Sequence, residues 1–336
     1  MAATVQPDRI LRELSELWVS LGEAHGDESA GVLRACAMTL VVLASAAEDE
    51  NAIGETLGAL MRDHPSRAIV VRVSDNAEPG LDARVFAQCW MPLGQRRQIC
   101  CEQIEISASN GSLADVPAVV LPLVAADLPV IVWSRLPRLF SSSALKDLSR
   151  IATKTILDSS AFADPPAALQ ALAHAATSGL LLADLAWTRL TRWRELIAQI
   201  FENPAYFSRI LSIRTVTIAH TAAVSQVSLD YMEAWLRLCL ERAGAQPAFL
   251  REPSDEACSS GFCRIAFTSG VSGGLDIVVR KVEGSAVEVR AGTLVNRTVF
   301  PQASDYALLR EELSITGHDP IYEAVLGRAA EAGMKQ

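Results

Sequence analysis

The hydrophobic pattern of the chain changes twice within residues 99–133. Residues 99–106 alternate as a half-solvated strand would, residues 116–124 leave room for a crossover helix, and residues 127–133 are short and continuously apolar. A continuously apolar strand is typical of a sheet that is covered on both faces. The pattern therefore predicts a β-α-β unit within a layered α/β domain.

The sequence before and after this unit predicts more elements of the same kind. Apolar residues at helical spacing predict helices at residues 7–24, 52–62 and 144–152. Apolar or alternating runs predict strands at residues 39–43, 68–73, 84–90 and 155–158. We therefore expect an N-terminal helix within residues 1–28, followed by a mixed, layered α/β domain at residues 29–162.

The sequence from Asp164 to Pro166 introduces a second pattern. Helical spacing predicts helices at residues 167–176, 183–201, 228–243 and 306–333. Between residues 246 and 300 the period is two, with glycine-rich turns, as in an antiparallel meander. The predicted fold class is α/β with two domains, the second being an α+β domain at residues 163–336.

Length and charge narrow the class of protein. A chain of 336 residues is about right for two domains. A net charge of -9 and an isoelectric point near 5.2 argue against a nucleic-acid partner. The N-terminal residues lack the features of a secretory signal, and the apolar runs are short for a bilayer span. We expect a cytoplasmic chain with no membrane partner.

The sequence offers little catalytic chemistry. The best glycine cluster, residues 270–274, leads into a strand and predicts a hairpin turn instead of a phosphate-binding loop. The five histidines are far apart and show no metal-ligand spacing. There is no Ser-His-Asp order and no glycine-flanked nucleophile. We expect no catalytic residue, no cofactor and no metal.

The seven cysteines are an odd number scattered through apolar runs, which favours reduced core thiols over a disulfide framework. Cys100 and Cys101 are adjacent strand residues that point to opposite faces, so they cannot readily join in an unstrained disulfide. A redox role for these two, or for Cys258 and Cys263 around a turn, is the alternative interpretation. It requires a lowered thiol pKa.

Two further clusters each allow two interpretations. His64, Ser66 and Arg67 precede a strand, where they form either a helix stop or a loop that grips a phosphate or carboxylate. The second cluster lies on one predicted helix, whose charged side is either a solvated face or a docking surface for a protein partner. Its residues are Trp187, Arg189, Arg192, Trp193 and Arg194.

Several stretches together resemble one known family, the glucose-6-phosphate dehydrogenase assembly proteins, OpcA. These stretches are residues 64–67, 100–104, 122–133, 185–194, 233–236, 311–313 and 319–322, and they keep the family's order and spacing over roughly residues 30–330. The chain departs from the family pattern in two places. Trp133 is followed by Ser134 where the family tends to have a second tryptophan, and Ala234 replaces a glycine.

The resemblance implies a non-catalytic assembly factor and allosteric activator that binds glucose-6-phosphate dehydrogenase in the oxidative pentose phosphate pathway. Trp187, Arg189, Trp193 and Arg194 are the predicted docking face. The alternative is a small-molecule-binding enzyme or sensor that uses the loop from His64 to Arg67 and a pocket at the carboxyl ends of the parallel strands.

Overall fold

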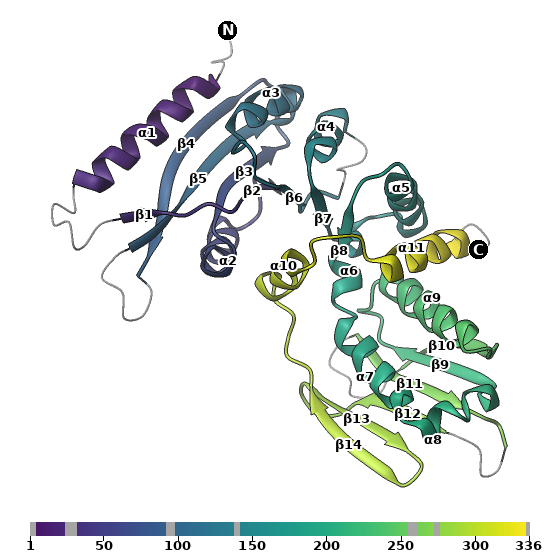
Figure 1. Cartoon of the computed structure of the whole chain (residues 1–336). Coiled ribbons are helices and arrows are strands. Elements are labelled where there is room, and N and C mark those ends of the chain that lie inside the picture. The colour runs from purple at the N-terminus through teal and green to yellow at the C-terminus, as the bar shows by residue number, and fades with distance from the viewer. Residues whose placement is uncertain are drawn as a thin grey trace. The chain divides into compact units, whose positions relative to one another are not determined.

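The computed structural model describes residues 5–23, 32–91, 98–137, 142–254, 261–271 and 276–333. Its contacts divide the chain into two compact units, each built around one sheet (Figure 1). Unit 1 comprises Met1–Ala161, Ala175–Asp184 and Asp305–Gly317, and unit 2 comprises Phe162–His174, Leu185–Ser304 and His318–Gln336. The predicted two-domain α/β class is confirmed.

Unit 1 contains an eight-stranded sheet, here called sheet A, within the described residues. Its order is β1-β5-β3-β2-β6-β7-β8, and β4 pairs with the other edge of β5. Among the described strands of sheet A, only β4 runs antiparallel to its neighbour. The strands are β1 (Val32–Arg34), β2 (Met38–Ser45), β3 (Ser66–Ser74), β4 (Leu81–Trp90), β5 (Gln98–Ser109), β6 (Val130–Ser134), β7 (Lys154–Leu157) and β8 (Leu182–Asp184).

Helices cover both faces of sheet A. One core cluster joins α1 (Pro7–Glu23), α3 (Val116–Val120) and α4 (Ser143–Ile151) to one face, through residues such as Ile10, Leu14 and Leu148. On the other face α2 (Glu50–Asp63) lies against α10 (Asp305–Ser314). Helix α5 (Pro165–Thr177) connects β7 to β8 along the chain. The predicted β-α-β unit is confirmed as β5, α3 and β6.

One prediction for unit 1 is wrong: strand β5 is not half-solvated. Glu102 and Glu105 are each only 3% exposed, because both faces of β5 are covered and arginines approach both carboxylates. The alternation of polar and apolar residues along β5 therefore reflects two buried ion pairs on opposite faces of the sheet, and not one solvent-exposed face.

The described part of unit 2 contains a six-stranded sheet, sheet B, in the order β10-β9-β11-β12-β13-β14. The strands are β9 (Thr215–His220), β10 (Ala248–Pro253), β11 (Phe262–Thr268), β12 (Ile277–Lys281), β13 (Ala286–Ala291) and β14 (Leu294–Val299). Its described helices are most of α5, α6 (Leu185–Thr188), α7 (Thr191–Glu202), α8 (Pro204–Phe207), α9 (Gln226–Arg242) and α11 (Pro320–Gly333). Short 3-10 turns elsewhere in the chain cover Asn110–Asp115, Leu121–Leu123, Ser159–Ala161 and Ile210–Ser212.

Two details of the second half differ from expectation. The predicted helix at residues 183–201 is divided into β8, α6 and α7, because Leu182–Asp184 pair with β7 and the buried Asp184 carboxylate accepts the Ser159 N–H. Strand β10 is parallel to β9, because helix α9 carries the chain back between them. The predicted meander therefore holds for β11 to β14 only.

A buried ion pair joins α10 to sheet A. Lys154 at the start of β7 donates to a Glu312 carboxylate oxygen at 2.8 Å and to the Glu312 and Ile315 carbonyls at 2.7 and 3.1 Å. Both side chains are about 5% exposed. If either side chain is replaced by an uncharged one, the other charge therefore stays buried without a counter-charge and without water.

We expect Glu312→Gln to lower the free energy of unfolding by about 3 kcal/mol, because the Lys154 ammonium would keep its burial and lose its counter-charge. Urea unfolding followed by circular dichroism measures this loss. The control is the double variant Lys154→Met/Glu312→Leu, which should lose less because no charge stays buried. A smaller loss in the single variant than in the double variant would contradict this account.

Candidate functional site

Sheet A has the strand order of a dinucleotide-binding fold. Counted along the chain, the parallel strands β2, β3, β5, β6, β7 and β8 lie in the order 3-2-1-4-5-6 across the sheet. In such sheets ligands bind outside the carboxyl ends of the strands, where the order reverses. Here the reversal lies between β2 and β6, which are neighbours. The loop from Ser45 to Glu50 after β2 therefore occupies the position of a phosphate-binding loop.

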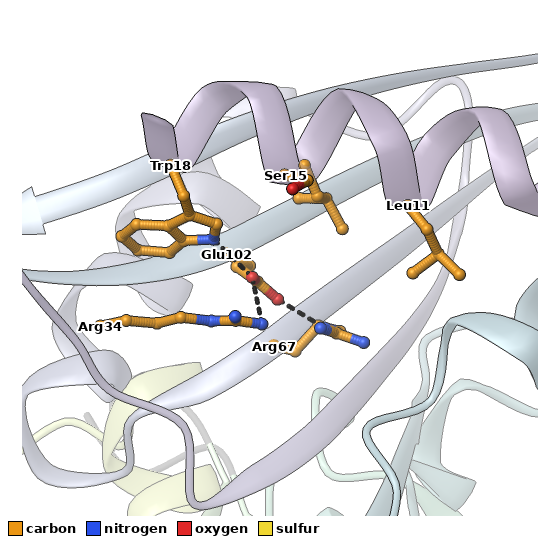
Figure 2. Close-up of a pocket in the computed structure, with 7 residues that line it drawn as sticks. Leu11, Ser15, Trp18, Arg34, Arg67 and Glu102 are labelled. Atoms are coloured by element: carbon orange, nitrogen blue, oxygen red, sulfur yellow. Dashed lines mark hydrogen bonds and ion pairs between the residues drawn. The ribbon is translucent and has the colours of Figure 1, made fainter. Parts of the chain in front are cut away.

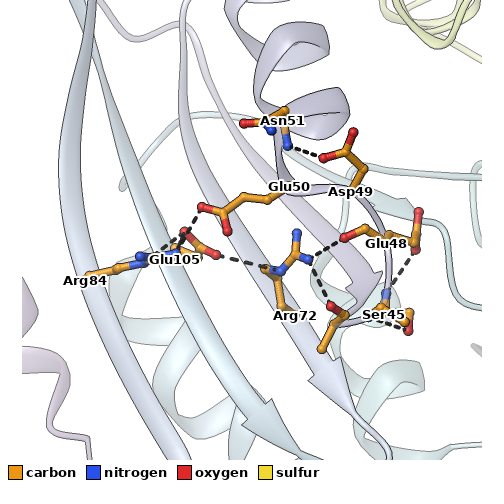
Figure 3. A network of polar contacts seen from close by, with 10 residues as sticks. Ser45, Glu48, Asp49, Glu50, Asn51, Arg72, Arg84 and Glu105 are labelled. Carbon is orange, nitrogen blue, oxygen red and sulfur yellow. Dashed lines mark hydrogen bonds and ion pairs between the residues drawn. The ribbon is translucent and has the colours of Figure 1, made fainter.

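This loop does not fit a dinucleotide. It has no glycine, and its last three residues are Glu48, Asp49 and Glu50. The Asp49 carboxylate accepts the Asn51 N–H at 2.9 Å at the start of α2, so a side chain already occupies the helix N-terminus that would hold a phosphate (Figure 3). Three carboxylates would also repel a pyrophosphate.

Arginines keep the loop in this conformation. The guanidinium of Arg72 donates to the Ala46 and Glu48 carbonyls at 3.1 and 2.6 Å (Figure 3). Arg135, which directly follows β6, donates to the Glu48 carboxylate at 2.5 Å and also contacts Asp305 of α10. The position at which a cofactor would bind is therefore held by contacts within the protein.

A second candidate is the cavity of about 270 Å³ beneath α1 (Figure 2). Its polar side is built on Glu102, which accepts from Trp18 Nε1 at 2.6 Å and pairs with Arg34 at 2.6 Å and with Arg67 at 2.5 Å. Arg67 also donates to the Leu123 carbonyl at 2.8 Å. The cavity is lined by Leu11, Leu14, Ser15, Trp18, Arg34, Arg67 and Glu102.

The residues of the predicted ligand loop do not converge on this cavity. Arg67 lines it, but Ser66 precedes Arg67 on β3, points to the opposite face and is 1% exposed. His64 ends α2, where its backbone N–H donates to the Leu60 carbonyl. The guanidinium of Arg67 already donates to Glu102, which also accepts from Trp18 of α1, and a ligand-binding role for His64, Ser66 and Arg67 stays a prediction.

The two tryptophans of the predicted docking helix lie in the core of unit 2. Trp187 is 3% exposed and Trp193 is 5% exposed. Trp187 packs near Tyr231 and Tyr322 at centroid distances of 6.0 and 5.9 Å. The Arg194 guanidinium stacks on Trp187 at 3.5 Å. Both indoles are therefore buried within unit 2, whereas Arg189 is exposed, and a docking role for these tryptophans with Arg189 and Arg194 stays a prediction.

The cysteines differ from the expectation of reduced thiols. Cys89 and Cys100 form a disulfide between β4 and β5, because the register places them directly opposite each other with Cα atoms 4.1 Å apart. Cys263 is also disulfide-bonded, and Cys258 lies outside the described residues. Burial raises the pKa of the Cys101 thiol to about 11, which disfavours the reactive thiolate. A redox role for these cysteines stays a prediction.

Sequence analysis missed a charged cluster on sheet B. Glu288 of β13 is fully buried. It pairs with Arg280 of β12, Arg290 of its own strand and Arg297 of β14 at 2.9, 2.6 and 2.9 Å. Hydrogen bonds from Arg297 first, and from the other two arginines, lower the pKa of Glu288 to about 2. The signal in the sequence was the alternation of charged and apolar residues in 286–299, but alternation alone does not give the register between strands.

The fold and these clusters define a class of protein: a two-unit α/β protein with a dinucleotide-type sheet whose phosphate-loop position is acidic and internally bonded. Two family models match the chain. Residues 58–174 match the glucose-6-phosphate dehydrogenase subunit N-terminal domain, and residues 181–326 match the corresponding C-terminal domain. The chain belongs to the OpcA family of glucose-6-phosphate dehydrogenase assembly proteins.

Curated relatives agree with this assignment. The chain is 29% identical over 181 residues to the "Putative OxPP cycle protein OpcA" of Nostoc punctiforme, which covers 53% of this chain and 38% of that protein. It is 29% identical over 182 residues to the protein of the same name from Synechocystis, and the match covers 53% of this chain and 35% of that protein. The match thus spans less than half the length of these relatives.

Solved structures give a weaker likeness. A 3-ketoreductase, KijD10 from Actinomadura kijaniata, aligns at a TM-score of 0.47 and 12% identity, over 88% of this chain and 96% of that chain. The UDP-N-acetylglucosamine 3-dehydrogenase GnnA from Acidithiobacillus ferrooxidans aligns at a TM-score of 0.41 and 12% identity, over 89% of this chain and 96% of that chain. At these scores the likeness carries no argument about activity. Among the described residues, no helix is long and apolar enough to cross a membrane.

We expect Glu102→Gln to lower the free energy of unfolding by about 3 kcal/mol and to expose α1 to trypsin, because Arg34 and Arg67 would lose their shared counter-charge. Urea unfolding and limited proteolysis measure the two effects. The control is Glu13→Gln, which removes only the exposed pair with Arg9 and should cost about 0.5 kcal/mol or less. Equal behaviour of the two variants would refute the anchoring role of Glu102.

The lowered pKa of Glu288 predicts a pH dependence of stability. Its folded-state pKa of about 2 lies below the ordinary value of 4.5, so the stabilisation is present above about pH 4.5 and is lost as the pH falls toward 2. Glu288→Gln should therefore lower the melting temperature at pH 7, and the difference from the wild type should shrink below pH 4.5. A difference that stays constant from pH 7 to pH 3 would contradict the assignment. The control is Glu283→Gln, an exposed residue, which should melt like the wild type at pH 7.

Proposed function

We propose that this chain binds glucose-6-phosphate dehydrogenase as a non-catalytic assembly factor and allosteric activator in the oxidative pentose phosphate pathway. One observation carries the proposal: two consecutive family models match residues 58–174 and 181–326, and both are described as domains of a glucose-6-phosphate dehydrogenase subunit. The proposal keeps the cytoplasmic location and the protein partner expected from the sequence.

The geometry at the reversal of strand order supports a non-catalytic role. An enzyme of this sheet type would use the loop after β2 to hold a cofactor phosphate. In this chain Glu48, Asp49 and Glu50 occupy that loop, and Arg72 and Arg135 hold it from within the protein. The residues at the position of a cofactor-binding loop therefore make hydrogen bonds and ion pairs within the protein.

The alternative, a small-molecule-binding enzyme or sensor, is not favoured. Its central residue would be Arg67, which lines the cavity beneath α1. A ligand carboxylate or phosphate would have to displace Glu102, which already accepts from Trp18 and pairs with two arginines in a buried site. Removing one partner of a buried ion pair is costly.

Activation by a partner requires a difference in affinity. A protein shifts the equilibrium between two forms of an enzyme only as far as it binds one form more tightly than the other. A tenfold preference for the assembled or active form supplies about 1.4 kcal/mol. We propose that this chain acts on the dehydrogenase in that way, without contributing a reacting group.

The test is a steady-state assay of the dehydrogenase from the same organism, with and without this chain, alongside size-exclusion chromatography of the mixture. We expect co-elution and a changed apparent substrate affinity or maximal rate. Serum albumin at the same concentration is the control for non-specific protein effects. Separate elution together with unchanged kinetics would overturn the proposed function.

A further inference from the structure

Among the described residues, helices cover one face of sheet B and leave the other face open. On the covered face, Phe201 of α7 packs against Phe267 of β11 at 5.3 Å, and Arg237 of α9 stacks on Phe249 of β10 at 4.1 Å. The alternate residues of the same strands form the open face, which includes Leu250 at 49% exposure. Among the described residues, the open face carries arginines on four neighbouring strands.

The register places these charges in one row. Arg264 of β11 lies opposite Arg280 of β12, Arg280 lies opposite Glu288 of β13, and Glu288 lies opposite Arg297 of β14. Arg290 lies two residues along β13 on the same face. We call Arg264, Arg280, Arg290 and Arg297 with Glu288 the arginine face. Strands β13 and β14 are the yellow-green hairpin of Figure 1.

The arginine face is positive in an acidic chain. Glu288 and Glu252, which pairs with Arg264, compensate two of the four arginines, so two positive charges remain. The chain as a whole carries a net charge of -9. Such a local reversal of sign favours an acidic partner through electrostatic complementarity.

Glu288 also holds the guanidinium groups in place. It accepts from Arg280 Nε at 3.1 Å, from Arg290 Nε at 2.6 Å and from Arg297 Nε at 3.0 Å. Each guanidinium has five N–H donors, and Glu288 engages at most two of any one of them. The Arg290 and Arg297 side chains remain 52% and 67% exposed. Donors are thus available to an external carboxylate without much loss of side-chain entropy.

Apolar side chains border the arginines on the same face. Val295 lies opposite Arg290, and Val299 lies two residues beyond Arg297; they are 56% and 64% exposed. Strand β14 is also an edge of sheet B. Arginine beside exposed apolar area is typical of protein interfaces. A nucleic-acid site would require a larger excess of positive charge than two.

We propose that the arginine face is the docking surface for a protein partner that presents a cluster of Asp and Glu carboxylates. The inference rests on the proposed function, in which that partner is glucose-6-phosphate dehydrogenase. The carboxylates of the partner accept charge-assisted hydrogen bonds from Arg280, Arg290 and Arg297, and the apolar side chains of the partner cover Val295 and Val299.

The test measures the dissociation constant of the complex with the dehydrogenase by biolayer interferometry at 50, 150 and 400 mM NaCl. We expect Arg290→Gln/Arg297→Gln to raise the dissociation constant about tenfold at 50 mM NaCl and to reduce its salt dependence. Arg297→Gln alone leaves two arginines on Glu288, preserves the fold and should show a smaller loss. The control Arg150→Gln/Arg328→Gln removes two paired surface arginines elsewhere and should bind like the wild type.

The outcomes separate the two proposals. Loss of affinity in both arginine-face variants, with wild-type circular dichroism and an unaffected control, supports the docking surface. Wild-type affinity of the single and double variants would overturn this surface and leave the proposed function standing. No binding of the wild-type chain to the dehydrogenase would overturn both. Tight binding of labelled duplex DNA at 150 mM NaCl, lost in the double variant, would overturn the assignment to an acidic protein.

Discussion

A carboxylate remains charged inside a protein only where cations and hydrogen-bond donors replace the water it has lost. Strand β5 imposes this requirement on both faces of sheet A. Glu102 faces α1 and is held by Arg34, Arg67 and Trp18, while Glu105 faces α2 and is held by Arg72 and Arg84. The helix layers on both sides therefore depend on charged groups in the middle of an otherwise apolar sheet.

The same requirement explains why the loop after β2 is built differently from a phosphate-binding loop. Arg72 lies between Glu105 and the carbonyls of Ala46 and Glu48, so one guanidinium serves both the buried carboxylate and the loop. The apolar core beside the sheet is formed by other residues. A fold can thus keep the strand order of one class of protein while its binding loop is used for internal contacts.

Hydrophobic periodicity predicted most helices and strands, including α1, α2, α9 and strands β2 to β7 of sheet A, because burial repeats with the geometry of each element. It did not predict the burial of Trp187 and Trp193 or the pairing of Cys89 with Cys100, which depend on contacts between distant segments. The candidate site was harder to predict from the sequence than the fold. The loop from His64 to Arg67 was found as a cluster, but the partner of Arg67 is 35 residues away on another strand. Predicting ion pairs across a sheet requires the register between its strands, which a single sequence does not give directly.

Helix α10 gives unit 1 an unusual dependence on the order of synthesis. Residues 305–317 belong to unit 1, although residues 185–304 of unit 2 precede them in the chain. Because translation proceeds from the N-terminus, Lys154 leaves the ribosome well before Glu312 does. Until then the strand that bears this lysine lacks its counter-charge, so unit 1 is not complete before residues 185–304 of unit 2 have been made. The described strands of sheet A, which end at Asp184, therefore lack helix α10 while those residues are synthesised.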